Sequence, residues 1–174
     1  MHIERPGSDE YDEFYADYVG KIEGNNVKAE LTAQLDELGE LVGGLSDEEA
    51  RYRYEEGKWS IKEVLGHLCD AERVFSYRAM SIARGEQQNL PGYEQDEYAA
   101  VAGFDRRPLE SLLWELRNLR GANAVLFESL NEEELQRRGN ANDVEVSVRA
   151  VAYIMAGHMA HHLAVLKERY LPAS

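Results

Sequence analysis

The amino-acid sequence predicts an all-α protein, a four-helix bundle with a short N-terminal helix or arm and short connecting helices. Three observations support this fold class. Apolar residues recur at spacings of three and four along separate segments of helical length. Ser or Asn is followed three positions later by Glu at several predicted helix starts. Alternation typical of a β-strand never extends beyond four or five residues.

Residues 1–26 are acidic with interleaved aromatic side chains, so we expect an N-terminal arm or short helix that packs on the bundle. The bundle domain is predicted in residues 27–174. Its first helix covers 27–45, where leucines recur with a helical period. Gly43 and Gly44 end this helix, because glycine readily adopts the left-handed conformation that follows a helix.

Capping residues place the next two bundle helices. Ser60, with Glu63 three positions later, forms a capping box that opens a helix running to about Arg84. Pro108 suits the first turn of the following helix, which extends to about Leu130.

A Gly- and Asn-rich stretch then leads to Ser147, which caps the last bundle helix, 148–170. Two further capping boxes predict short connecting helices. They are Ser46 with Glu49 and Asn131 with Glu134.

The long connection 85–107 determines the predicted topology. It contains three glycines and a proline and leaves room for at most a short helix. At ~3.3 Å per residue it is long enough to cross the bundle lengthwise. The second and third helices can then run parallel, which gives up-down-down-up order. We interpret the segment 86–98 as a surface crossover rather than as a lid over a site.

Composition excludes several classes of partner. The formal net charge of −14 disfavours nucleic acid and anionic membrane surfaces, since both need clustered Lys and Arg. No apolar run approaches the ~20 residues that span a bilayer, and the acidic N-terminus lacks the apolar core of a signal peptide. Cys69 is the single cysteine, which excludes an internal disulfide. We therefore expect a cytoplasmic protein that acts on a small molecule.

Histidines are the candidate site residues. On a helical wheel of the last helix, His158 and His162 face the same apolar side, whereas His161 lies on the flank. The i, i+4 spacing of His158 and His162 is one that zinc-binding helices use. His67 lies at the edge of the apolar stripe of the second bundle helix and can point into a groove between helices.

Three neutral imidazoles suit Zn²⁺, Ni²⁺, Fe²⁺ or Cu²⁺ and leave positions open for water or substrate. Glu63 or Asp70 could orient His67 by a hydrogen bond, and Glu63 could instead act as a general base. A single histidine that faces the core is more often a core residue than a metal ligand. Here the pair His158 and His162, together with His67, favours a metal site. Cys69 is interpreted as a small core residue. Trp59 and Trp114 are interpreted as core anchors.

Two motifs carry a resemblance to a known family. They are W-S-x-x-E-x-x-x-H, ending at His67, and G-H-x-x-H-H, which contains His158 and His162. With the segment LPGYEQDEY between them, they make residues 27–171 similar to the DinB-like family, in the DinB/YfiT-like superfamily. The resemblance implies a four-helix bundle with a metal held by His67, His158 and His162.

The resemblance also implies a range of functions. Some relatives are metal-dependent transferases or isomerases that use low-molecular-weight thiols such as bacillithiol or mycothiol, and others are called metal-dependent hydrolases. Our first hypothesis is a transferase that adds such a thiol to a small electrophile. The alternatives are a hydrolase using metal-bound water and a non-catalytic metal-binding stress protein. No motif for thiol binding can be placed in the chain. A homodimer is compatible with the resemblance, because relatives often pair.

Overall fold

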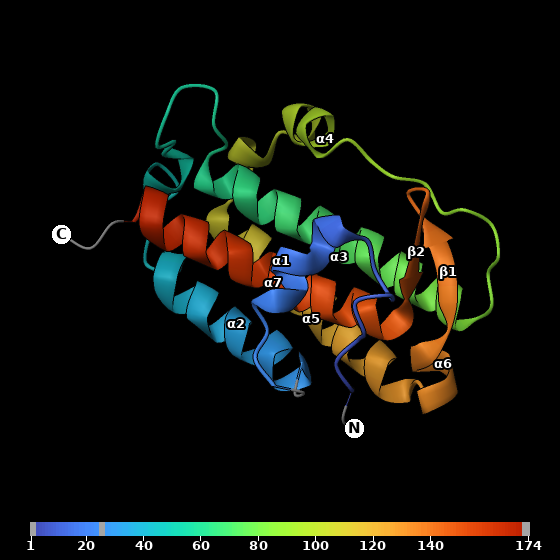
Figure 1. The fold of residues 1–174 in the computed structure, drawn as a ribbon. Coiled ribbons are helices and arrows are strands. Elements are labelled where there is room, and N and C mark those ends of the chain that lie inside the picture. Colours follow the sequence, from blue (N-terminus) through green and yellow to red (C-terminus); the bar gives the residue numbers. More distant parts are fainter. Residues whose placement is uncertain (1–2, 25–26, 172–174) are drawn as a thin grey trace.

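Four long helices form the body of the protein, and a computed structural model describes residues 3–24 and 27–171 of it (Figure 1). The four are α2 (Val27–Val42), α3 (Ile61–Ala83), α5 (Leu109–Ser129) and α7 (Val148–Val165). A π-helical segment, Leu166–Tyr170, continues α7. The predicted all-α fold class is confirmed. None of the helices described is long and apolar enough to cross a membrane.

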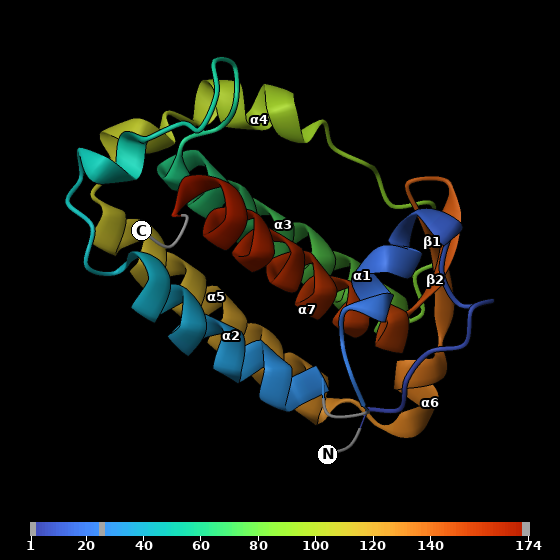
Figure 2. The ribbon, with the colours of Figure 1, turned by 60° about the vertical axis from the view of Figure 1, so that its left-hand side comes forward.

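The helices follow the predicted up-down-down-up order. In Figures 1 and 2, α2 and α7 run in one direction while α3 and α5 run in the other. Each of α2 and α3 contacts both α5 and α7, which makes a closed ring of four helices. Figure 2 shows how the connection returns from the end of α3, past the hairpin and through α4 (Gln95–Ala102), to the start of α5.

One close packing contact fixes the end of this connection. A short 3₁₀ turn, Phe104–Arg106, follows α4, and Phe104 is buried. A Cβ atom on Gly66 would lie 2.3 Å from the Phe104 ring. Only glycine therefore leaves room for this ring against α3.

Short elements complete the fold. A 3₁₀ turn at Glu13–Tyr15 leads into α1 (Ala16–Gly20), another lies at Glu49–Arg51, and α6 (Glu132–Gln136) follows α5. The capping boxes predicted at Ser60 and Asn131 are confirmed. The one at Ser46 also forms, but it opens the 3₁₀ turn rather than an α-helix.

A β-hairpin lies where the sequence analysis expected only a Gly- and Asn-rich link. Strand β1 (Arg138–Ala141) pairs antiparallel with β2 (Val144–Ser147). Asn142 and Asp143 connect them, both with positive φ, at 55° and 63°. Positive φ at both central residues is typical of a type I′ turn, and Asn and Asp tolerate it. The strands are too short for their alternation to stand out in the sequence.

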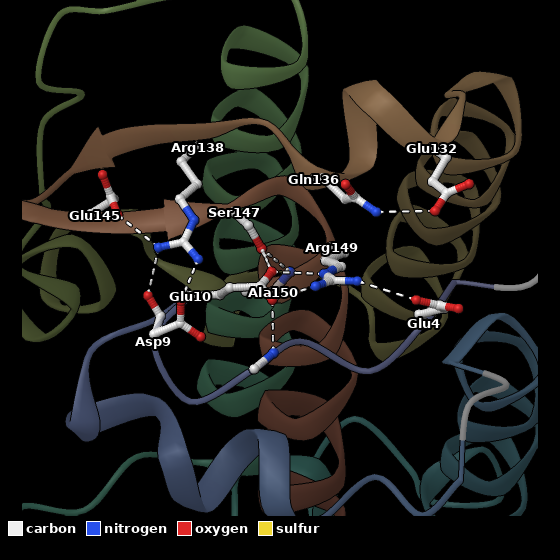
Figure 3. Close-up of polar contacts among 11 residues, drawn as sticks. Glu4, Asp9, Glu10, Glu132, Gln136, Arg138, Glu145, Ser147, Arg149 and Ala150 are labelled. Carbon is white, nitrogen blue, oxygen red and sulfur yellow. Dashed lines mark hydrogen bonds and ion pairs between the residues drawn. The ribbon is translucent and has the colours of Figure 1, made fainter.

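The N-terminal segment is held on the bundle by buried polar contacts, shown in Figure 3. The Glu10 side chain accepts hydrogen bonds from Ser147 Oγ and Arg149 Nε, each at 2.7 Å. Burial alone would raise the pKa of Glu10, but hydrogen bonds from Arg149, the Gly7 amide and Ser147 lower it to about 2. Figure 1 shows the result: α1 lies over α7, near its middle.

Candidate metal centre

The structure brings together the three histidines that the sequence singled out. His67 comes from the first half of α3, and His158 and His162 come from the second half of α7. One nitrogen of each ring lies within 4.8 Å of the others. The ring centroids are 5.0 Å apart for His67 and His158, 5.0 Å for His67 and His162, and 4.6 Å for His158 and His162.

His161 lies beside this group without joining it. Its ring contacts the ring of Tyr18 at 5.6 Å and that of His162 at 5.1 Å. It is half-buried, whereas His67 and His158 are buried. The wheel of α7 therefore distinguished the inward pair from the flanking histidine.

The environment keeps the three rings neutral. Burial lowers the pKa of His67 to about 4. Burial and the neighbouring His67 and His161 lower the pKa of His162 to about 3. Burial, assisted by the other rings, also lowers the pKa of His158 well below its ordinary value. Neutral imidazole is the form that ligates a metal.

The donor set fits a divalent cation. His67 Nε2 and His158 Nε2 are 3.0 Å apart, and nitrogens bound to one tetrahedral zinc at ~2.0–2.1 Å are roughly 3.3 Å apart. His162 Nδ1 is buried and has no hydrogen-bond partner among the residues that the structure describes. A buried polar atom without a partner is costly, and an ion can supply that partner.

Aromatic side chains close most sides of the histidine group. The Trp59 ring lies 4.8 Å from the His67 ring. Tyr18 of α1 and Phe75 of α3 contact His158 edge-to-face, at 5.6 and 5.7 Å. A Cβ on Gly157 would lie 1.9 Å from the Tyr18 carbonyl oxygen, so only glycine lets α1 approach α7 this closely.

A cavity of about 670 Å³ reaches the group on the remaining side, where His161 and His162 line it. Its other walls come from the loop before α3, from α4 and from the end of α7. This volume is within the usual range for small-molecule sites. The structure thus places an opening of ligand size beside His162.

The two acidic candidates pair with arginines, Glu63 with Arg53 and Asp70 with Arg73, rather than with His67. Glu63 lines the cavity. Its carboxylate accepts a hydrogen bond from the Ser60 amide at 2.8 Å and forms an ion pair with Arg53 at 2.9 Å. Burial raises the pKa of Asp70, against the opposing effect of Arg73. Among the described residues, neither carboxylate hydrogen-bonds to His67. The role of Glu63 as a base or as an orienting group stays a prediction.

The sequence analysis also interpreted Cys69, Trp59 and Trp114 as core residues. Cys69 lies in the core with its Sγ 3.8 Å from the Leu112 carbonyl oxygen, and burial raises its pKa to about 12. It is a core residue, as expected. Trp59 is half-buried on the cavity wall. The interpretation of Trp114 as a core anchor is wrong, because its side chain is 68% exposed on α5.

Sequence reasoning missed a buried polar layer next to the histidines. Arg120 of α5 pairs with Glu72 of α3 at 2.5 Å and donates to Gln34 Oε1 of α2 at 3.1 Å. Asn123 Nδ2 donates to Glu72 Oε2 at 2.6 Å, and Gln34 Nε2 donates to the Ala156 carbonyl. Burial raises the pKa of Glu72, while Arg120 and Asn123 oppose that shift.

This polar layer links all four bundle helices. The apolar core of the described residues falls into two clusters, one toward the hairpin and one toward the opposite end. The polar side chains of the layer lie between the members of these clusters on α2, α3 and α5. The inward position of a charged residue on an otherwise amphipathic helix was the available sequence signal for Glu72 and Arg120.

Fold and site together define the class of the protein: an up-down-down-up helical bundle in which three histidines of α3 and α7 converge. The family model described as the DinB superfamily matches residues 30–166. The chain therefore belongs to the DinB superfamily.

Similar proteins carry names that point to metal chemistry. A protein of Oceanobacillus iheyensis, 28% identical over 79% of this chain and 80% of its own length, is named "Putative metal-dependent hydrolase". A protein of Geobacillus kaustophilus with the same name is 30% identical over 74% of this chain and 73% of its own length.

A solved structure shares the fold. YfiT from Bacillus subtilis superimposes with a TM-score of 0.71 and 19% identity, covering 94% of this chain and 89% of YfiT. It is described as a probable metal-dependent hydrolase with an unusual four-helix bundle topology. At this identity the likeness concerns the fold alone.

Proposed function

We propose that this chain is a metal-dependent hydrolase whose divalent cation is held by His67, His158 and His162. The convergence of three neutral ring nitrogens within 4.8 Å is the observation that carries the proposal. The names of the relatives support hydrolysis rather than thiol transfer, the function that the sequence analysis put first. A divalent cation in such a site lowers the pKa of a water molecule and polarises a substrate carbonyl.

The residues of the chain would bind the cation, keep bulk water away from it and leave room for a substrate. The lowered pKa values of His67 and His162 keep both rings available as ligands at neutral pH. Tyr18 and Phe75 cover His158, so bulk water does not reach the group from that side. The cavity beside His162 leaves room for a small substrate.

Glu63 is the candidate group for moving a proton. It lies on the cavity wall, one helical turn before His67. Its carboxylate accepts a hydrogen bond from the Ser60 amide and forms an ion pair with Arg53, so it is held in place on the cavity wall. An ionised carboxylate at this wall can accept a proton from water, or orient a substrate.

Two measurements on one preparation test the proposal. Protein purified without chelator and without affinity-tag nickel is analysed for metal, and is then assayed on 4-nitrophenyl esters and 4-nitroanilides. We expect about one divalent metal per chain and hydrolysis that needs no thiol. His162→Ala should lose both, and apo-protein should regain activity when metal is restored.

Other results would contradict the hydrolase. Turnover of an electrophile such as monochlorobimane only when bacillithiol or mycothiol is present would instead support the transferase. Stoichiometric metal with neither activity would support the non-catalytic metal-binding protein. Absence of bound metal under every loading condition would overturn the site itself.

A further inference from the structure

We propose that the cavity beside His162 binds a small organic anion with a planar body, whose anionic group contacts Lys58 and whose planar part packs on Trp59. The inference rests on the proposed function only in taking this ligand to be the substrate. Binding itself requires neither metal nor turnover.

The surroundings of the histidines leave this cavity as the approach for a ligand. Trp59 covers His67, and Tyr18 and Phe75 cover His158. His67 and His158 are 3% and 6% exposed, whereas His162 borders the cavity. A reacting bond near the metal would therefore lie at the His162 end, with the rest of the ligand extending toward the loop before α3.

An ordered aromatic wall lines that path. Tyr54 and Trp59 come from the loop before α3, and Tyr170 comes from the end of α7. Tyr170 Oη donates a hydrogen bond to the Trp59 carbonyl at 2.7 Å, and its ring meets the Tyr54 ring edge-to-face at 4.9 Å. These contacts fix the wall before a ligand arrives. Flat apolar groups pack well against such rings.

Charges around the cavity favour an anion at Lys58. The Arg53 side chain is already compensated by Glu63 at 2.9 Å and Asp105 at 3.0 Å. Lys58, next to Trp59 in the chain, also lines the cavity, and its side chain has no ion pair with any described residue. Lys58 is exposed, and of the two basic side chains on the cavity wall it is the one without an ion pair among the described residues.

Asp96 is the opposing charge on the cavity wall, and it too lacks an ion pair among the described residues. It lies in the first turn of α4, where a carboxylate interacts favourably with the helix dipole. This local role accounts for Asp96, whereas Lys58 is exposed on the cavity wall, where its ammonium group can meet a ligand. The cationic side of the cavity is therefore the one that we assign to the ligand.

The two tryptophans make the proposal directly measurable. In Trp114→Phe protein, Trp59 is the remaining tryptophan, so its emission reports on the cavity alone. Trp114 is exposed and does not line the cavity, which makes this background a neutral one. Three probes with the same biphenyl body and different charge are titrated into metal-free protein: 4-phenylbenzoate, 4-phenylbenzamide and 4-phenylbenzylamine.

We expect a saturable change in Trp59 emission, with 4-phenylbenzoate bound roughly threefold more tightly than the amide and the amine bound most weakly. Lys58→Arg should keep this order, Lys58→Glu should abolish the preference for the anion, and Asp96→Asn should leave it or strengthen it. Circular dichroism of each variant confirms that the exposed substitutions leave the helices intact.

Tighter binding of the amine, or an anion preference unchanged in Lys58→Glu, would overturn the assignment of charge. The absence of saturable binding by all three probes would overturn the planar-ligand site. Because the titration uses metal-free protein, either result is distinguishable from failure of hydrolysis. A hydrolase that binds none of these probes would keep the proposed function and lose this inference.

Discussion

His67 Nε2 lies 3.0 Å from His158 Nε2, although 91 positions separate the two residues in the chain. With both rings neutral, one nitrogen donates a hydrogen bond and the other accepts it. A divalent cation would replace this single bond with two ligand bonds. Metal binding therefore competes with a hydrogen bond that already holds α3 and α7 in register.

Replacing His162 with Ala should abolish stoichiometric metal binding, because it removes one of three converging nitrogens. Replacing His161 with Ala is the matched control and should preserve most of the binding, since this ring lies outside the group. Equilibrium dialysis with Zn²⁺ or Co²⁺ measures both variants. Equal losses would show that the two neighbours are not functionally distinct.

Removal of metal should leave the bundle folded. Two apolar clusters extend along the four helices, and neither includes a histidine. Metal should raise the melting temperature only because it binds the folded state. At a metal concentration of a hundred times Kd, this binding adds about 2.7 kcal/mol to the free energy of unfolding. Circular dichroism before and after adding chelator measures the effect. Loss of the helical signal would mean that the metal is structural.

Metal-free protein should lose stability as pH falls from about 6.5 toward 4. Burial lowers the pKa of His67 to about 4 and of His162 to about 3, whereas the unfolded chain titrates near 6.5. The unfolded state therefore binds more protons in this range, and acid favours it. We expect about 2 kcal/mol less stability per buried histidine at pH 5 than at pH 7.5.

Urea unfolding at the two pH values measures this loss. His67→Gln should show a smaller difference between them, because one titrating group is gone. The pKa of Glu10 is lowered to about 2, so the stability that its contacts contribute is lost only as the pH falls from about 4.5 to 2. A stability that stays constant from pH 7.5 to 5 would contradict burial of neutral rings.

Gly157→Ala should displace α1 from α7, because the added Cβ would meet the Tyr18 carbonyl oxygen at 1.9 Å. Overpacking of this kind typically costs about 1–3 kcal/mol. Gly121→Ala on α5 is the control. No neighbouring atom of the described residues lies within 4 Å of its Cβ position, so this substitution should stabilise the helix by about 0.5–1 kcal/mol. Thermal unfolding compares the two.

Glu72→Gln should destabilise the protein by about 3–5 kcal/mol, since it leaves the buried Arg120 charge without its partner. The double variant Glu72→Met with Arg120→Met removes both charges and should recover most of that loss. Urea unfolding of Glu72→Met, Arg120→Met and the double variant completes the cycle. A double variant less stable than Glu72→Gln alone would show that the pair contributes net stability.

Local pattern was sufficient for the helices and for the direction of the inward histidines. Capping at Ser60 and Asn131 depends on residues three positions apart, and a helical wheel relates His158 to His162 across a single turn. The apolar stripe of the second predicted bundle helix placed His67 at its edge, and the family motifs then joined His67 to the pair. These features were predictable because each depends on neighbours within a few residues, or on a motif read as a unit.

The remaining features depend on residues that meet only in the folded chain. The sequence by itself determined four amphipathic helices, their caps and the histidines that share a face. Tertiary structure decided that Trp114 is exposed, that Glu72 and Arg120 pair inside the bundle and that Tyr18 covers His158. It also decided which side of the histidine group opens to a cavity. Helical periodicity shows which residues share a face, but contacts between distant segments arise only when those faces pack together.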